Sequence, residues 1–377
     1  MSVPASDCIA RLRLSQFRSY PSLDVRFSGA PVVLYGPNGA GKTNILEAVS
    51  LLSPGRGLRG AKISELGYRQ SGQESGHRWA VAARLKNSGH KIGTGSIESA
   101  PNRRQMRLDG KPASGPDISR ILSVNWLTPA HDRLFVGPTA ERRKFFDRLC
   151  LSHVPDHGRT FLAYEKARAE RGRLFVDGIH DTYWLDALEK ELATGGARIA
   201  KTRHAMLERL NGEIMSRMDG VFPKSTLALD GDAEALYAAG ADVDEVTDWI
   251  KTELEKDRPL DRKAGRTLRG VHKTDLKVTH LEKNMPAGQC STGEQKALLI
   301  GLVLAHARCR PGAPPILLLD EVAAHLDDHR RAALAHELFD LHTQVFLTGT
   351  DARLFEAFVG KAELFRVEDN ALHLQDG

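Results

Sequence analysis

Residues 31–46 read Pro-Val-Val-Leu-Tyr-Gly-Pro-Asn-Gly-Ala-Gly-Lys-Thr-Asn-Ile-Leu, and this stretch decides the fold. The apolar run from Val32 to Tyr35 predicts a buried parallel strand. Residues 36–43 fit the phosphate-loop pattern G-x-x-x-x-G-K-[ST], and a helix is expected directly after them, over residues 44–52. A plain glycine-rich turn between a strand and a helix is the alternative interpretation.

The residue types of this loop suit an anionic ligand. Three glycines let the backbone wrap closely, so that successive N–H groups point inward at an anion, and the helix N-terminus adds partial positive charge. Lys42 can reach the β- and γ-phosphates of a nucleotide such as ATP, and the Thr43 hydroxyl can ligate Mg²⁺. The predicted nucleotide contacts are Gly36, Pro37, Asn38, Gly39, Ala40, Gly41, Lys42 and Thr43.

Length and composition describe an ordinary soluble globular protein. The chain has 377 residues, of which 41% are hydrophobic and 27% charged, enough for two domains or one domain with a large insertion. No run of 18 apolar residues and no signal-peptide pattern occurs, which predicts no membrane span. The four cysteines (8, 150, 290 and 309) form no C-x-x-C pair and fit a reducing cytoplasm. The net charge of +5 is compatible with a polyanionic partner without requiring one.

The segment before the loop alternates apolar and polar residues over positions 8–29, which predicts an antiparallel hairpin. Its turn carries Phe17-Arg18-Ser19-Tyr20. Because this hairpin leads straight into the phosphate-loop strand, Arg18 is a candidate nucleotide contact. An aromatic-flanked turn without a ligand remains the other interpretation.

Basic residues follow the loop in a glycine-broken segment, 53–62, and in predicted short strands at 78–86, 90–99 and 103–108. They could form a track for nucleic-acid phosphates or merely a solvated sheet face. The candidate DNA contacts are Arg56, Arg59, Lys62, Arg103 and Arg104.

The middle of the chain is helical. Helices are predicted at 139–152, 161–175, 182–218 and 242–254, the third with a break or kink at Gly195-Gly196. No heptad pattern persists long enough for a coiled coil, so this block is interpreted as an inserted helical arm. Short strands are expected again between residues 266 and 280. The predicted domains are therefore a head formed by 1–130 and 266–377, with an arm formed by 131–265.

Residues 316–319, Ile-Leu-Leu-Leu, predict a central parallel strand beside the phosphate-loop strand, and two carboxylates follow it. Asp320 is the expected partner of Mg²⁺, together with Thr43. Glu321 is the candidate that orients the attacking water or accepts its proton. A capped strand end is the alternative interpretation.

Residues 290–296, Cys-Ser-Thr-Gly-Glu-Gln-Lys, precede an apolar helix. A serine at this place is a good helix N-cap, which is the ordinary explanation. The pattern also resembles the signature sequence of ABC-type ATPases, in which the serine and glycine contact the γ-phosphate held by a second subunit. By that resemblance Ser291, Gly293 and Gln295 bind the nucleotide of a second copy, and Ala324 to Asp327 resemble the D-loop.

The long interval between Lys42 and Ser291 resembles the SMC, Rad50 and RecF group, and several segments are similar to the RecF family. These segments are Phe17-Arg-Ser-Tyr20, Gly41-Lys-Thr-Asn-Ile-Leu-Glu-Ala-Val49, Leu51-Leu-Ser-Pro-Gly-Arg56, Leu127-Thr-Pro-Ala-His-Asp132, Arg142-Arg143 with Phe146-Asp147, and Leu317-Leu-Leu-Asp-Glu-Val322. The resemblance implies an α/β fold: an ABC-type P-loop ATPase head, with a mixed sheet and an antiparallel β-subdomain, plus the helical arm.

The sequence departs from the family pattern at three places. Gly270-Val-His-Lys-Thr-Asp-Leu276 replaces Gly-Pro-His-Arg-Asp-Asp-Leu, and Glu294 stands where glutamine is usual. The histidine that follows the last strand in transporter ATPases is absent, and Thr348-Gly-Thr-Asp351 occupies the region. The glutamine loop is expected at 128–132.

The resemblance further implies a cytoplasmic, ATP-dependent DNA-binding protein of recombinational repair and replication-fork maintenance. It would form an ATP-driven homodimer on duplex DNA near single-strand gaps and act with RecR and RecO to load RecA, supporting the SOS response. ATP hydrolysis would be weak and coupled to dimer dissociation. Two rivals remain at this point: an ABC-type ATPase that does not act on DNA, and a scaffold whose nucleotide is only structural.

Overall fold

The computed structural model describes the chain except residues 1–6, 70–77, 98–99, 180, 310–313 and 376–377. The chain forms two compact units. The first unit comprises residues 1–132, 219–222 and 299–377, and the second comprises 133–218 and 223–298. The first boundary lies close to the predicted residue 130. The second falls later than the predicted residue 265, so the signature segment belongs to the second unit.

The first unit contains an antiparallel sheet in the order β2-β1-β4-β5-β6-β7. Its strands are β1 (Ile9–Phe17), β2 (Tyr20–Arg26), β4 (Ala80–Leu85), β5 (Lys91–Ile97), β6 (Ala100–Leu108) and β7 (Lys111–Pro112). Buried and exposed residues alternate along β4 and over Leu12 to Ser15 of β1, as the period of two for a half-buried strand requires. The predicted N-terminal hairpin is confirmed by the β1–β2 pair.

The second sheet of this unit has the order β15-β14-β3-β13-β12-β8. Its strands are β3 (Val32–Tyr35), β8 (Val124–Leu127), β12 (Ile316–Leu319), β13 (Val345–Gly349), β14 (Glu363–Glu368) and β15 (Ala371–Gln375). All neighbours are parallel except the β14–β15 pair. The expectation that β12 lies beside β3 is wrong, because β13 pairs with both strands and separates them.

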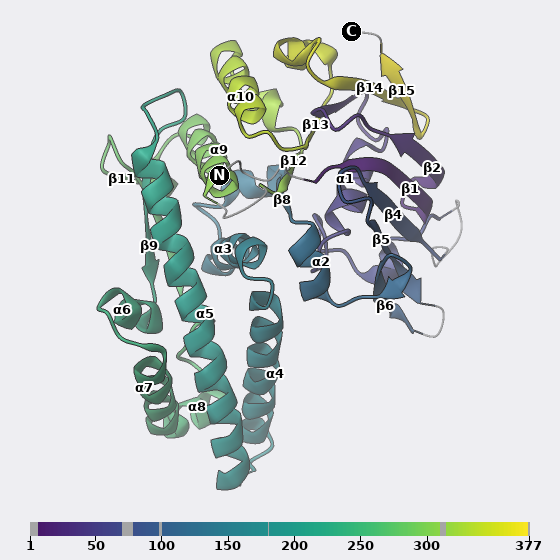
Figure 1. Ribbon diagram of the computed structural model, residues 1–377. Coiled ribbons are helices and arrows are strands. Elements are labelled where there is room, and N and C mark those ends of the chain that lie inside the picture. The colour runs from purple at the N-terminus through teal and green to yellow at the C-terminus, as the bar shows by residue number, and fades with distance from the viewer. Residues whose placement is uncertain (1–6, 70–77, 98–99, 180, 310–313, 376–377) are drawn as a thin grey trace. The chain divides into compact units, whose positions relative to one another are not determined.

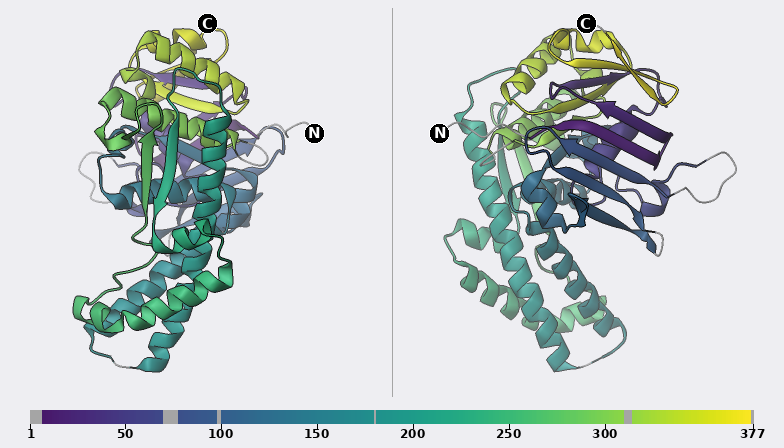
Figure 2. Two further views of the ribbon diagram at one scale, coloured as in Figure 1. Left: turned by 90° about the vertical axis from the view of Figure 1, so that its left-hand side faces the viewer. Right: turned by 45° about the vertical axis from the view of Figure 1, so that its right-hand side comes forward.

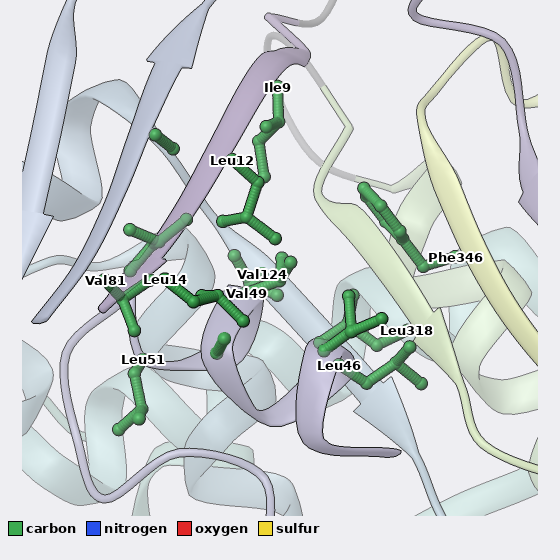
Figure 3. Close-up of a cluster of buried hydrophobic side chains, with 14 of the residues drawn as sticks. Ile9, Leu12, Leu14, Leu46, Val49, Leu51, Val81, Val124, Leu318 and Phe346 are labelled. Carbon is green, nitrogen blue, oxygen red and sulfur yellow. The ribbon is translucent and has the colours of Figure 1, made fainter. Parts of the chain in front are cut away.

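One hydrophobic core joins the two sheets through α1 (Lys42–Ser50), the helix that follows the phosphate loop. Leu12 and Leu14 of β1, Leu46 and Val49 of α1, and Phe346 of β13 are all buried in this cluster (Figure 3). The start of α1 is therefore fixed from both sides. Two further helices of the unit are α2 (Gly115–Ile121) and α10 (Asp328–Asp340).

The second unit is mainly helical (Figure 1). Its helices are α3 (Thr139–His153), α4 (His157–Val176), α5 (Thr182–Ser216), α6 (Asp232–Ala238), α7 (Val243–Lys256) and α8 (Arg258–Ala264). It also holds the antiparallel sheet β11-β10-β9, formed by β9 (Ser225–Asp230), β10 (Asp275–His280) and β11 (Met285–Pro286). Helix α9 (Thr292–Arg308) begins in this unit and ends in the first.

Helices α4 and α5 lie side by side in both views of Figure 2 and form the centre of the helical core. Of the predicted break or kink at Gly195-Gly196, the break is wrong, because α5 is continuous through both residues. A Cβ at Gly196 would lie 3.2 Å from the Cδ1 of Ile250, and one at Gly195 would lie 3.5 Å from the Cβ of Tyr164. The glycines thus allow α4 and α7 to approach α5 closely.

Residues 266–274, expected to include a strand, form turns that precede β10. Among the residues that the structure describes, no helix has both the length and the apolar character needed to cross a membrane.

Candidate functional site

The phosphate loop lies between β3 and α1, at the carboxyl end of a parallel strand. Gly39 and Gly41 have φ values of 84° and 100°, a conformation that side chains other than glycine rarely adopt. The Lys42 side chain turns back and donates to the carbonyl oxygens of Gly36 and Pro37, at 2.7 and 2.9 Å. Burial lowers the pKa of the Lys42 ammonium, whereas Glu321 and Asp320 oppose that shift. The Lys42 ammonium thus binds carbonyl oxygens of its own loop.

The two predicted acids meet this loop through β13. Thr43 donates its hydroxyl to Asp320 at 2.9 Å, and Thr348 donates to the same carboxylate oxygen at 2.7 Å. The Thr348 hydroxyl also accepts the backbone N–H of Glu321 at 2.9 Å. Glu321 itself has a φ of 53°, a strained value for a residue with a Cβ. Thr348 therefore orients both acids, a role that the sequence analysis did not assign to it.

The residues present fit a magnesium ion. Asp320 is buried, and the partners of its carboxylate Oδ1 among the described residues are the hydroxyls of Thr43 and Thr348. Carboxylate and hydroxyl oxygens are the hard ligands that Mg²⁺ prefers, and a cation would balance the buried charge. When bound, the ion would neutralise phosphate charge. Thr43 and Asp320 are the residues that would hold it.

Arg18 lies at the tip of the β1–β2 hairpin, at a φ of 51°. Its guanidinium donates through two nitrogens to the fully buried Glu47 carboxylate of α1, both at 2.8 Å. Arg59, a predicted DNA contact, donates to the same carboxylate at 3.2 Å and to Asn44 at 2.8 Å. Both arginines are thus attached to the helix that carries the phosphate loop. A direct contact of Arg18 with the nucleotide stays a prediction.

The signature segment, residues 290–296, contains the N-terminal tip of α9. We call Ser291, Thr292 and Gly293 the signature tip. Ser291 and Thr292 are exposed, and Gly293 is partly exposed. The Glu294 carboxylate accepts both the N–H and the hydroxyl of Ser291, at 3.0 and 2.9 Å, and pairs with the Lys283 ammonium. These partners, Lys283 first, lower the pKa of the Glu294 carboxyl to about 2. The departure at Glu294 thus forms a capping box that holds the tip.

Gln295 differs from its neighbours at the tip. It is buried, and its amide donates to the carbonyl of Cys290 at 2.8 Å. This contact closes the turn before α9. The structure therefore gives Gln295 a supporting role under the tip, where the sequence predicted a direct nucleotide contact.

The predicted DNA contacts separate into two groups. Arg56, Lys62 and Arg103 are exposed. Arg104 is different, because its guanidinium donates to the carbonyl oxygens of Leu51 and Ser53 at 2.6 and 2.8 Å. Burial lowers the pKa of Arg104 to about 10. Arg104 thus has a structural role beside Leu51 and Ser53, and its contact with DNA stays a prediction.

Residues 270–276, where the sequence differs from the usual family pattern, pack within the second unit. Asp275 accepts two hydrogen bonds from Arg142 of α3, at 2.7 and 2.9 Å. His272 contacts the Tyr164 hydroxyl at 2.8 Å through Nδ1, and burial lowers its pKa to about 4. Thr274 donates to Glu234, which also binds Arg203. These residues link α3, α4 and α6 to β10.

A phosphate loop at the end of β3, an acid pair at the end of β12 and an antiparallel side sheet define a P-loop ATPase head of the SMC-like class. Residues 8–373 match the family described as RecF/RecN/SMC N terminal domain. The chain belongs to this family and, within it, to the RecF proteins, because its curated relatives over nearly the full length are named "DNA replication and repair protein RecF".

Two relatives and one solved structure support that assignment. The chain is 46% identical over 378 residues to the RecF protein of Caulobacter sp. (strain K31), with 96% of each sequence covered. It is 46% identical over 375 residues to that of Mesorhizobium japonicum, with 97% of each covered. A solved structure of the recombination mediator protein RecF with ATP in the RecFOR pathway is similar with a TM-score of 0.81 and 25% identity, covering 98% of this chain and 100% of the other.

Proposed function

We propose that this protein binds ATP and Mg²⁺ at the phosphate loop and uses the nucleotide to join two copies into a DNA-binding dimer. The observation that carries the nucleotide part is the hydrogen-bond chain from Thr43 through Asp320 to Thr348 and Glu321. Lys42 would leave the loop carbonyls for the β- and γ-phosphates. Glu321 would orient water for slow hydrolysis, which releases the dimer.

The second half of each nucleotide site would come from the Ser291 tip of another copy. The exposure of Ser291 and Thr292 supports this part of the proposal, because a buried tip could not reach a second molecule. Helix N-termini favour anions, and the γ-phosphate is the outermost group of bound ATP. ATP would then link two copies, and its hydrolysis would remove the link.

The DNA part of the proposal rests on the exposed face of the antiparallel sheet. A row of four basic residues crosses four adjacent strands, each residue directly opposite the next: Arg26, Arg11, Arg84 and Lys91. Like charges in such cross-strand positions destabilise a sheet, so the row is costly unless an anion neutralises it. Asp24 binds Arg11 and offsets part of this charge.

The small residues beside this row leave room on the sheet face for the sugar-phosphate backbone of DNA. Ala80, Ala82, Gly93 and Gly95 occupy the centre of the exposed face and carry almost no side chain. A shallow hollow of about 670 Å³ lies over them, and Arg107 lines its edge. This arrangement favours sequence-independent contact with duplex DNA, since phosphates carry no base information.

By the same family resemblance, the dimer would act in the cytoplasm near single-strand gaps, with RecR and RecO helping RecA to load. An ABC-type ATPase that does not act on DNA is the second candidate. Stimulation of ATP hydrolysis by duplex DNA distinguishes the two: we expect stimulation, and its absence together with absent DNA binding favours the second candidate.

Light scattering with ATP, ADP and no nucleotide tests the dimer. Only ATP should give the dimer mass, and Glu321→Gln should prolong that state by slowing hydrolysis. A monomer under all three conditions would contradict the proposal.

Salt titration of binding to gapped duplex tests the DNA face. The logarithm of the binding constant should fall steeply with the logarithm of the salt concentration. Arg84→Ala should reduce that slope by about one phosphate contact, whereas Lys144→Ala on α3 should not change it. A flat dependence in the unmodified protein would contradict phosphate recognition.

A further inference from the structure

The tip of the β1–β2 hairpin, residues 18–20, contacts the phosphate loop and α1. Each of its three residues meets a different turn of the loop and helix. Three successive hairpin residues meet three residues that are spaced three apart along the loop and helix. The pairs are Tyr20 with Gly41, Ser19 with Asn44, and Arg18 with Glu47. Because residues three apart share one face of a helix, the hairpin tip covers one continuous face.

Two of these contacts are satisfied within the chain. The Asn44 amide donates to the Ser19 hydroxyl at 2.9 Å. The Arg18 guanidinium is paired with the fully buried Glu47 carboxylate through two hydrogen bonds. These contacts fix the hairpin tip and leave it little freedom to move relative to α1.

The third contact is incomplete. Tyr20 is fully buried, and its hydroxyl has no hydrogen-bond partner among the described residues. The hydroxyl lies against the phosphate loop: a Cβ added to Gly41 would be only 2.6 Å from it. A buried hydroxyl without a partner has lost its hydrogen bonds to water without replacement, so it is an unfavourable group at this place.

The loop must rearrange when a nucleotide binds. Lys42 now donates to the carbonyls of Gly36 and Pro37, and it has to leave them to reach the phosphates. In the proposed nucleotide complex, that movement would free the carbonyl oxygens of Gly36 and Pro37 and would bring phosphate oxygens to the loop. Tyr20 is the buried donor beside Gly41 that has no acceptor before this change.

We propose that Tyr20 is a positioning residue for the phosphate loop, and that its hydroxyl gains its acceptor oxygen only in the nucleotide-bound loop. The inference rests on the proposed nucleotide function and specifies how the N-terminal hairpin takes part in it. The hydroxyl is unfavourable in the empty protein and favourable in the bound one. Its removal therefore has opposite effects on the two states, which a merely structural tyrosine would not produce.

Tyr20→Phe tests this with two measurements on the full-length chain. Titration calorimetry with ATP should show binding that is about five- to tenfold weaker, as expected for one lost hydrogen bond. The thermal midpoint without nucleotide should stay equal or rise by a degree or two, because an unpaired buried group has been removed.

Thr94→Val is the matched control. Thr94 lies on β5 of the same sheet, is buried, and also has a hydroxyl without a partner. Its replacement should likewise preserve or raise the thermal midpoint, but it should leave the ATP affinity unchanged. The pair separates loss of an unpaired hydroxyl from loss of a nucleotide-linked contact.

Two results would overturn the inference. One is an unchanged ATP affinity in Tyr20→Phe while the unmodified protein binds ATP. The other is a midpoint several degrees lower in the nucleotide-free variant, because the hydroxyl would then already have a partner. If the unmodified protein itself binds no ATP, the proposed nucleotide function fails first, and the two failures are thereby distinguished.

Discussion

The phosphate loop and the signature tip are both helix N-termini, yet their surroundings are opposite. At the phosphate loop, the lysine and the nearby aspartate are buried and already hydrogen-bonded within one unit. At the signature tip, Ser291 and Thr292 are exposed, and a neighbouring carboxylate caps the helix. The comparison teaches that one helix end has a lysine, hydroxyls and an acid already held together within its own unit. The other is exposed and is capped by the Glu294 carboxylate, so any partner of its free surface would have to come from another molecule.

Lys42→Arg should have the largest effect. The larger, planar guanidinium cannot occupy the narrow place where the Lys42 ammonium contacts two loop carbonyls, so ATP binding should fall by about a hundredfold or more. Titration calorimetry with ATP checks this. Lys361→Arg, whose ammonium lies over the Phe339 ring, is the control and should bind as the unmodified protein does. Equal affinity in both variants would remove Lys42 from the site.

Ser291→Ala should come next and should separate the two helix ends. Because the tip is outside the phosphate loop's unit, ATP affinity of the monomer should remain unchanged, while the ATP-dependent dimer should weaken by about tenfold or more. Light scattering over a range of protein concentrations measures the second quantity. Arg353→Ala, at an exposed position near the C-terminus, is the matched surface control. A variant that pairs normally would show that the tip has no part in assembly.

Thr348→Val should have a smaller effect, confined to turnover. The change removes the hydroxyl that connects Asp320 to the N–H of Glu321 but preserves the shape of the side chain. Steady-state hydrolysis should slow by about tenfold while ATP affinity changes little. Thr343→Val, in the turn that precedes β13, is the control, because its hydroxyl donates to the Pro315 carbonyl. Undiminished turnover in Thr348→Val would mean that the acids hold their positions without it.

The last prediction concerns the pH dependence of the second unit's stability, with no expected effect on the nucleotide site. His272 has a pKa lowered to about 4 by burial, so it is neutral in the folded chain while the unfolded chain binds a proton below pH 6.5. Its contribution to stability is therefore lost as the pH falls from 6.5 toward 4, by at most about 3 kcal/mol. Urea unfolding at a series of pH values measures it. His272→Gln should show a shallower loss over this window, and an unchanged slope would contradict the assignment.

Much of the first unit was predictable from particular residues. The Val32–Tyr35 and Ile316–Leu319 runs became β3 and β12 within the expected bounds, because apolar runs of only four residues bounded by polar or glycine residues favour buried strands. The loop and the two acids also stand together as the motifs indicated. The order of the strands was not predictable, and β13 lies between β3 and β12.

The glycine pair in α5 shows why some predictions failed. Intrinsic propensity indicated a break at Gly195-Gly196, but packing against Tyr164 and Ile250 outweighs the roughly 1–2 kcal/mol that two glycines cost a helix. Arg104 shows that the role of a charged residue also depends on tertiary contacts that the sequence does not reveal. A run of basic residues does not indicate which side chain is exposed. The Arg104 guanidinium donates to two backbone carbonyls, whereas its neighbour Arg103 is exposed.

The sequence by itself determined the phosphate loop, the acid pair, the signature segment and the family, because each depends on residue types at short, fixed spacings. Only the tertiary structure decided that Thr348 connects the two acids, that Arg18, Ser19 and Tyr20 cover one face of α1, and that Arg26, Arg11, Arg84 and Lys91 align in one row. The reason is physical: these contacts join residues distant along the chain, and their register depends on strand order and core packing.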